Sequence, residues 1–317
     1  MYATLISFTL IVLSGVVFRR LKPGGIDADT ARNSINATVL NIFLPALCIK
    51  IFSETTLDIE AVLVPATAAA TICTLMAVTH FVFKILGKFK SISMAEVGAL
   101  IICASFGNTT YLGLPVITEL YGPAAQKYVL YYDLMTATPI LWLIGAQVAA
   151  RYGNCERQSE KTSVCRKEML YSSVVTVLSL PPIWGVIIGG IIQTAGIALP
   201  EPVFRALSLL GSLVVPLMIF SIGLAITIPK VSHVYCAAVS GVIKLIISPM
   251  LAYVVAKKLG LDGIALNACA VEGAMPTMVV SLLIAARFNL DVTLSAFMIV
   301  STTACSLFTL PIIVKLL

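Results

Sequence analysis

The stretch SFGNTTYLGLP, residues 105 to 115, is the least lipid-compatible segment inside any apolar run of this sequence. Pro115 removes a backbone N–H and its ring clashes with the carbonyl four residues back, while Gly107 and Gly113 weaken a helix further. Backbone groups without partners at membrane depth are tolerated only inside protein or beside a watery cavity. A packed proline kink is the alternative. We predict a membrane helix that is broken here, with four polar side chains beside the break: Asn108, Thr109, Thr110 and Tyr111.

A second unusual segment, VEGAMPT at residues 271 to 277, lies inside another apolar run. The carboxylate of Glu272 costs roughly 2.5–3.5 kcal/mol on insertion scales unless it is paired, protonated or hydrated. Gly273 and Pro276 predict a second helix break. We expect Glu272 to bind a cation or a proton, and a structural ion pair with Lys244 stays open as the alternative.

The composition places both segments in an integral membrane protein. Of the 317 residues, 59% are hydrophobic and 11% are charged, whereas soluble domains contain about 25% charged residues. A chain so poor in charge cannot cover a soluble globule of this size. Its net charge of +6 is spread over many short loops without a basic block, which excludes nucleic-acid binding.

Apolar runs of about 20 residues recur along the whole chain, and each is long enough to cross a bilayer as a helix. Only helices and closed barrels satisfy their backbone in lipid, and no run alternates like a barrel strand. Each run is therefore predicted to be a helix. The ten predicted spans are residues 2–18, 33–52, 61–86, 97–119, 128–150, 169–194, 206–228, 233–256, 263–287 and 292–315.

One substantial hydrophilic stretch, residues 152 to 168, leaves five spans on either side. An odd number of spans per half makes two homologous halves insert with opposite orientations, as in many secondary transporters. Pro45 and Pro216 lie in corresponding spans of the halves, as do Pro115 and Pro276. The predicted fold is an all-α membrane protein with a five-helix repeat over 1–151, a cytoplasmic loop over 152–168, an inverted repeat over 169–317, and crossed broken helices four and nine.

The basic residues give the orientation. If the N-terminus is outside, fourteen Lys and Arg residues fall on the inner side and six on the outer side. Because cytoplasmic loops are enriched in Lys and Arg, this favours a multi-pass protein of the inner or plasma membrane with both termini outside.

Two interrupted helices that cross would bring half-helix ends of both signs to one point. The N–H ends can hold a carboxylate, while the carbonyl ends can ligate Na⁺ or orient a proton carrier. Pro115 and Pro276 are expected to open the second half-helices. Pro45, after Asn41, and Pro216, after Ser212, either bend their spans around the crossing or form bare kinks. The candidate coupling residues are Asn108, Thr109 and Glu272, and the candidate substrate-binding residues are Asn41, Pro45, Asn108, Thr110, Tyr111, Gly113, Pro115, Gly273, Met275, Pro276 and Thr277.

The sequence predicts neither a metal centre nor an enzyme. The eight cysteines include no CxxC pair, and six lie in apolar runs, which favours buried small hydrophobes. His80 and His233 are the only histidines and neither has a partner at ligand spacing. Ser/His, paired-aspartate and HExxH constellations are missing from the sequence.

Three segments together resemble the auxin efflux carrier family, which includes plant PIN-formed carriers and short bacterial and yeast relatives. They are NIFLPAL at 41–47, GNTTYLGLPV at 107–116 and EGAMPTMVVSLLIAARFNLD at 272–291. The resemblance extends over the whole chain. It implies a fold similar to that of bile-acid sodium symporters and sodium–proton antiporters, with a scaffold part and a transport part that contains the crossed broken helices.

The resemblance also implies a small organic acid as substrate: auxin in plants, or dicarboxylates such as malonate and malate in some bacterial relatives. By motif, Asn108 and Pro115 belong to one crossover, and Pro276 and Thr277 to the other. The Asn that follows the second crossover proline in plant carriers is missing here, which disfavours an auxin-like substrate. Glu272 resembles the acidic sodium ligand of the bile-acid symporters.

We therefore expect a secondary transporter that moves a small organic anion by alternating access, with Asn108 and Thr277 donating hydrogen bonds to the substrate. Symport with Na⁺ and with H⁺ both stay open, and no other cofactor is expected. The expected partners are the substrate and the lipid bilayer, with a homodimer left open. The alternatives are a bile-acid-type sodium symporter for amphipathic anions and a ligand sensor that does not transport.

Overall fold

The computed structural model of the chain describes residues 2–55, 58–87, 92–153, 171, 174–225 and 234–317. Regular structure in these ranges is helical, apart from one isolated antiparallel bridge between Gly107 and Thr277. The prediction of an all-helical protein is confirmed. Most of the predicted central loop and the start of the sixth predicted span lie outside the described residues.

The α-helices follow the predicted apolar runs, although several runs are divided. In chain order they are α1 (Tyr2–Leu21), α2 (Ala28–Thr38), α3 (Leu44–Glu54), α4 (Glu60–Leu86), α5 (Met94–Ser105), α6 (Leu114–Tyr121), α7 (Gln126–Tyr132), α8 (Thr138–Ile140), α9 (Ala146–Gly153), α11 (Pro181–Thr194), α12 (Glu201–Ser212), α13 (Val214–Ala225), α14 (Val234–Val242), α15 (Ser248–Lys258), α16 (Gly263–Gly273), α17 (Val280–Arg287) and α18 (Val292–Leu316).

Short turns of other helix types join these segments. Two are 3₁₀ turns, η1 (Pro23–Gly25) and η4 (Pro123–Ala125). Five are π turns: η2 (Val39–Phe43), η3 (Thr109–Gly113), η5 (Asp133–Ala137), η6 (Leu141–Gly145) and η7 (Ile243–Ile247).

Four of the π turns end two residues before a proline: Pro45, Pro115, Pro139 and Pro249. Proline cannot donate to the carbonyl four residues back and its ring crowds that carbonyl, so a wider i→i+5 turn relieves both problems. After η5, for example, the N–H of Thr138 bonds to the carbonyl of Asp133. These prolines are therefore absorbed by local widening of a helix that continues.

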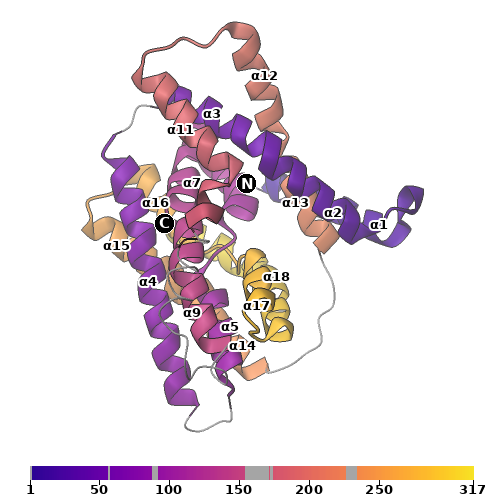
Figure 1. Cartoon of the computed structure of the whole chain (residues 1–317), viewed down its shortest axis with the longest axis vertical. Helices are drawn as coiled ribbons and strands as arrows, with labels where there is room; N and C mark the ends of the chain where they lie inside the picture. The colour runs from indigo at the N-terminus through magenta and orange to yellow at the C-terminus, as the bar shows by residue number, and fades with distance from the viewer. Residues whose placement is uncertain (1, 56–57, 88–91, 154–170, 172–173, 226–233) are drawn as a thin grey trace. The chain divides into compact units, whose positions relative to one another are not determined.

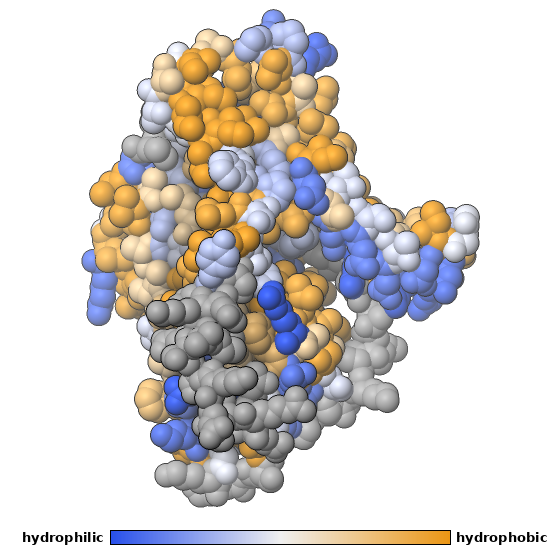
Figure 2. All heavy atoms as spheres, viewed as in Figure 1, coloured by the Kyte–Doolittle hydropathy of each residue, from blue (hydrophilic) through white to orange (hydrophobic). Residues whose placement is uncertain are grey.

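Six stretches of the described chain are long and apolar enough to cross a membrane, by length and composition. They are Ala28–Glu54, Glu60–Leu86, Pro123–Gly153, Glu201–Ser221, Val234–Lys258 and Val292–Leu316. Large apolar side chains also lie exposed on many helices, and apolar residues cover much of the described surface in Figure 2. These features indicate a multi-pass membrane protein, while the ten-span inverted repeat stays a prediction.

The described chain divides into two compact units, and each draws on both halves of the sequence. Unit 1 comprises Met1–Asp58, Thr110–Leu130 and Leu178–Thr227. Unit 2 comprises Ile59–Thr109, Tyr131–Val177 and Ile228–Leu317.

Unit 1 is packed through close backbone contacts at glycines. α11 lies along α3 (Figure 1), and a Cβ added at Gly189 would be 2.7 Å from Phe52 Cβ and 2.9 Å from the Ile49 carbonyl oxygen. Where α1 meets α13, a Cβ at Gly223 would overlap the Val12 carbonyl oxygen. Small residues allow membrane helices to approach this closely.

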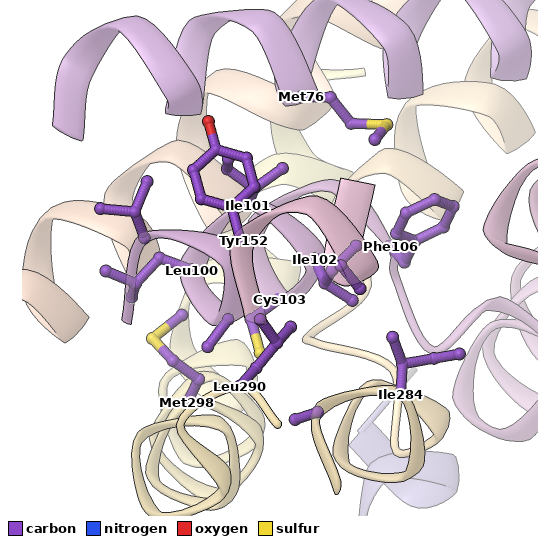
Figure 3. Close-up of a cluster of buried hydrophobic side chains, with 14 of the residues drawn as sticks. Met76, Leu100, Ile101, Ile102, Cys103, Phe106, Tyr152, Ile284, Leu290 and Met298 are labelled. Carbon is purple, nitrogen blue, oxygen red and sulfur yellow. The ribbon is translucent and has the colours of Figure 1, made fainter. Parts of the chain in front are cut away.

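Unit 2 has a large apolar core centred on α5, every residue of which from Glu96 to Ser105 is buried. Figure 3 shows the side chains of Leu100, Ile102 and Cys103 from α5 together with Met298 from α18. A further member, Tyr152 of α9, bonds to His80 of α4 through its hydroxyl. The core therefore fixes α5 on several sides, up to the point where the helix ends at Ser105.

Candidate functional site

Both predicted helix breaks are present, and they contact each other within unit 2. The first break follows α5 at Phe106, and the second separates α16 from α17. The N–H of Asn108 donates to the Pro276 carbonyl oxygen at 2.7 Å, and the N–H of Met278 donates to the Phe106 carbonyl oxygen at 3.0 Å. Each break thus satisfies backbone groups that the other leaves without a helical partner.

From the sequence we expected each crossover proline to open the second half of its helix. Neither proline does so. After the first break the chain resumes at once in η3, and Pro115 lies at the second position of α6. After the second break α17 begins at Val280, four residues beyond Pro276. The reason in the first case is that η3 widens the backbone ahead of Pro115, so the break falls earlier, at the glycine-containing segment 106–108.

Thr277 holds the crossing together. Its hydroxyl donates to the Cys103 carbonyl oxygen at 2.9 Å. Its backbone N–H donates to the Thr302 hydroxyl at 3.1 Å, and that hydroxyl donates in turn to the Met298 carbonyl oxygen at 2.7 Å. Because the hydroxyl proton of Thr277 is already used, the geometry assigns Thr277 to positioning the breaks, whereas we had expected it to donate to a substrate.

A lysine ammonium reaches the same crossing. Lys244, in η7, is 1% exposed, and its Nζ donates to the Gly273 carbonyl oxygen at 3.0 Å and to the Ser248 Oγ at 3.3 Å. A Cβ added at Gly107 would lie 3.1 Å from this Nζ. Gly273 is the last residue of α16, where the helix dipole is negative, so a cation is stabilised at this place. A larger residue at position 107 would crowd the end of the lysine side chain beside the first break.

The ion pair between Glu272 and Lys244 that the sequence left open does not form within the described residues. Glu272 is 1% exposed, and neither of its carboxylate oxygens has a hydrogen-bond partner among the side chains and backbone that the structure describes. The same holds for Asn108 Oδ1, Thr109 Oγ1 and Ser105 Oγ. The breaks therefore concentrate oxygens that are not used within the described fold. Each buried polar group without a partner lowers the stability of the fold by about 1–3 kcal/mol.

A further carboxylate lies in the same unit. Asp133, the first residue of η5, is 2% exposed, and its Oδ1 accepts a hydrogen bond from the Thr138 hydroxyl at 2.9 Å. The charges of Asp133 and Lys244 both act on Glu272. The depth of Asp133 could not be predicted from the sequence, because a helical pattern alone does not show which face of a span is buried.

The other candidate substrate-binding residues divide between the units. Gly273, Met275 and Pro276 belong to unit 2 with the breaks. The side chain of Asn41 is exposed and donates to the Ala37 carbonyl oxygen of its own helix at 2.7 Å. The candidates in unit 1 are Asn41, Pro45, Thr110, Tyr111, Gly113 and Pro115. Sequence reasoning missed the hydrogen bonds of Lys244 and Ser248 to Gly273. It also missed those between Asp133 and Thr138 and between Thr302 and Thr277.

Within the described ranges, no group of three or more His, Cys, Asp or Glu side chains is arranged to hold a metal ion. Six cysteines in those ranges are free thiols: Cys48, Cys73, Cys103, Cys236, Cys269 and Cys305. Beside the two helix breaks the arrangement therefore offers a buried lysine, two buried carboxyl groups, and a set of unused amide and hydroxyl oxygens.

Comparison with known proteins gives concordant matches over the chain. The family described as membrane transport protein matches residues 3–314. An uncharacterized transporter of Methanothermobacter thermautotrophicus is 24% identical over 98% of this chain and 96% of its own length. An uncharacterized transporter of Methanocaldococcus jannaschii is 26% identical over 67% of this chain and 66% of its own length. The uncharacterized transporter YfdV of Escherichia coli is 23% identical over 82% of this chain and 80% of its own.

Proposed function

The chain belongs to the membrane transport protein family, which confirms the family predicted from the three motifs, and on that premise we propose that it is a secondary active transporter of a small organic anion. The observation that supports this best is the contact between two helix breaks in unit 2, surrounded by buried oxygens that the described fold leaves unused. Helices interrupted at membrane depth are typical of ion and substrate sites in secondary transporters.

The charge beside the breaks favours an anionic substrate. The Lys244 ammonium lies next to Gly107, so a carboxylate near the first break would meet a positive charge in a medium of low dielectric. The first turn of α17 adds the positive end of a helix dipole just after the second break. We assign Asn108 as the side chain that contacts the substrate, and Thr277 as the residue that positions the two breaks.

The unused oxygens favour coupling to a cation. Asn108 Oδ1, Thr109 Oγ1 and both oxygens of Glu272 are buried acceptors, which a proton or a metal cation would satisfy. We therefore propose that Glu272 accepts the coupling ion, and that unit 2 alternates between access to the two sides of an inner or plasma membrane, with both termini outside. Thr110, Tyr111, Gly113, Pro115 and Pro45 stay predictions for the substrate path.

A thermal-shift screen tests the substrate class. Purified protein in detergent is heated with a panel of mono- and dicarboxylates, and with cholate, each in sodium chloride and in choline chloride. A ligand that binds the folded state raises the melting temperature, by an amount that grows with concentration. We expect a small carboxylate to raise the melting temperature. In Asn108→Ala, at least ten times more of that ligand should be needed to produce the same rise.

The matched control is Ser105→Ala, which removes another buried oxygen at the end of α5. A shift by cholate alone would favour the bile-acid-type alternative. Small-acid shifts that are unaltered in Asn108→Ala would overturn the assignment of the substrate site. Binding without uptake into vesicles would favour a sensor.

A further inference from the structure

Three charged side chains from three helical segments of unit 2 are almost completely buried, and we refer to them as the ionic cluster: Asp133, Lys244 and Glu272. Their exposed fractions are 2%, 1% and 1%. They come from η5, η7 and α16. Both η5 and α16 pack on α4, and α16 packs on the α15 helix that continues η7, so all three segments share one core.

The cluster is held by specific hydrogen bonds that leave Glu272 open. Lys244 is fixed by the Gly273 carbonyl and by Ser248, whose hydroxyl also donates to that carbonyl at 2.8 Å. Asp133 is fixed by the Thr138 hydroxyl. Glu272 lies next to Gly273 in the chain, and its two oxygens have no hydrogen-bond partner in the part of the chain that the structure describes.

The charges of the ionic cluster do not balance. Lys244 is the one buried Lys or Arg among the described residues, whereas Asp133 and Glu272 are both acidic. With all three ionised, one negative charge is left in a buried site, where an uncompensated ion costs several kcal/mol. One bound positive charge would remove this cost.

Two neighbouring titratable groups leave this count unchanged. The charges of Tyr132 and Cys269 couple to the cluster, and a phenol and a thiol are neutral at pH 7. Glu60, at the start of α4, acts on Cys269. The imbalance of one charge therefore belongs to Asp133, Lys244 and Glu272.

The surroundings of Glu272 suit a proton better than a metal ion. Na⁺ needs several oxygen ligands, and the carbonyl of Gly273 already accepts from both Lys244 and Ser248. A proton needs a single acceptor, which either oxygen of Glu272 provides.

We propose that Asp133, Lys244 and Glu272 together form a site that binds one proton, with Glu272 as its carrier and Asp133 as the second carboxylate that sets the charge. This rests on the proposed function for its role in transport: one proton is taken up by the site in each cycle, and the neutral cluster then lies in the membrane interior without an unpaired charge. Protonation forms an O–H bond on a Glu272 oxygen and breaks none in the protein.

Infrared spectroscopy of the purified protein at pH 7 tests the charge count, because a protonated carboxylic acid has a carbonyl stretch separate from that of a carboxylate. The wild type should show one such group per molecule. Glu272→Gln should show none, and Asp133→Asn should also show none, since Glu272 and Lys244 then balance. Lys244→Met should show two, because both carboxylates must then be neutral.

The matched control is Glu96→Gln, which replaces another buried acid of unit 2 at a capping position where glutamine also fits. It should leave the band unchanged. A band that persists in Glu272→Gln, or is unchanged in Asp133→Asn, would overturn the proposal. So would a band that sodium chloride abolishes and choline chloride does not, because the cation would then be Na⁺.

Two features keep this test decisive. Glu272→Gln and Asp133→Asn preserve side-chain size, so they decide the matter even if Lys244→Met does not fold. The spectrum needs no substrate, so a missing band overturns the proton site whatever the thermal-shift screen shows. A correct band in protein that binds no carboxylate would overturn the proposed transport function and leave the proton site standing.

Discussion

Both units contain close contacts at glycines, but they differ in where their charged side chains lie. In unit 1 the helices meet through glycine backbones, as where Gly189 of α11 lies against Phe52 of α3. Each of its ion pairs has at least one exposed side chain, and in the pair of Lys22 with Asp27 at 3.3 Å both are exposed. In unit 2 the charged residues Asp133, Lys244 and Glu272 are buried around two helix breaks.

Unit 1 carries its charges at the surface, whereas unit 2 keeps charged groups in its interior. Close apolar packing resists deformation, because any added atom meets a backbone. Exposed ion pairs add little to stability, about 0–1 kcal/mol, so unit 1 gains its stability from packing. Unit 2 keeps buried charges and unused oxygens that lower its stability, as functional sites commonly do. The comparison predicts that glycine substitutions damage unit 1 without regard to pH, while substitutions in the ionic cluster of unit 2 have effects that depend on pH.

The largest loss of stability is expected from Lys244→Met. Removing one partner of a buried charged group costs about 3–5 kcal/mol. The folded variant must bind two protons, whereas the unfolded chain binds none at neutral pH, so its stability should rise as the pH falls. The melting temperature between pH 8 and pH 5 measures this, with the exposed Lys258→Met of α15 as control. A loss that does not change with pH would contradict the account.

A smaller loss is expected in unit 1 from Gly189→Leu. The new side chain would overlap Phe52 and the backbone at Ile49, and overpacking of this kind costs about 1–3 kcal/mol. Gly190→Leu is the control, because a Cβ at Gly190 meets nothing within 4 Å. The fall in melting temperature should be the same at pH 5 and pH 8. Equal effects of the two variants would refute close packing of α11 on α3.

Thr302→Val sharpens the comparison within unit 2. The valine leaves the Thr277 N–H in the second break without its acceptor, at a cost of about 1–3 kcal/mol. The neighbouring Thr303 bonds only within its own helix, to the Ile299 carbonyl oxygen, so Thr303→Val should change the melting temperature less. Hydrogen exchange at Thr277 should increase in the first variant alone. Equal exchange in both variants would show that Thr302 does not hold the crossing.

The smallest effect is expected from Asp27→Asn, at the N-terminus of α2. The backbone N–H of Asp29 and the ammonium of Lys22 hold the pKa of Asp27 below its ordinary value. A lowered pKa in the folded state means that the carboxylate stabilises the fold above its ordinary pKa, and that this is lost as the pH falls through the lower value. Asparagine caps equally well, so melting curves of the two proteins should differ slightly at pH 7 and coincide near pH 2. A difference that persists at low pH would have another cause.

Much of this arrangement could be predicted from the sequence. Glycines, a proline and polar residues in one apolar run located the first break, and the same logic located the second. The place of Pro115 relative to the break was not predictable. A π turn and a helix break both remove the steric clash that a proline causes, and which of them forms depends on the packing around Phe106. Likewise, Lys244 could be paired with Glu272 or with the α16 carbonyl, and only the fold shows that it bonds to Gly273.

The most direct test of the account is uptake into reconstituted vesicles. Labelled malonate, or the acid that raises the melting temperature most, is offered with and without an imposed proton gradient. We predict that the gradient increases uptake several-fold in the wild type and in Glu96→Gln, and that Glu272→Gln binds the acid yet loses this dependence. Gradient-driven uptake that is unchanged in Glu272→Gln would contradict the claim that the buried charges of unit 2 couple transport to a proton.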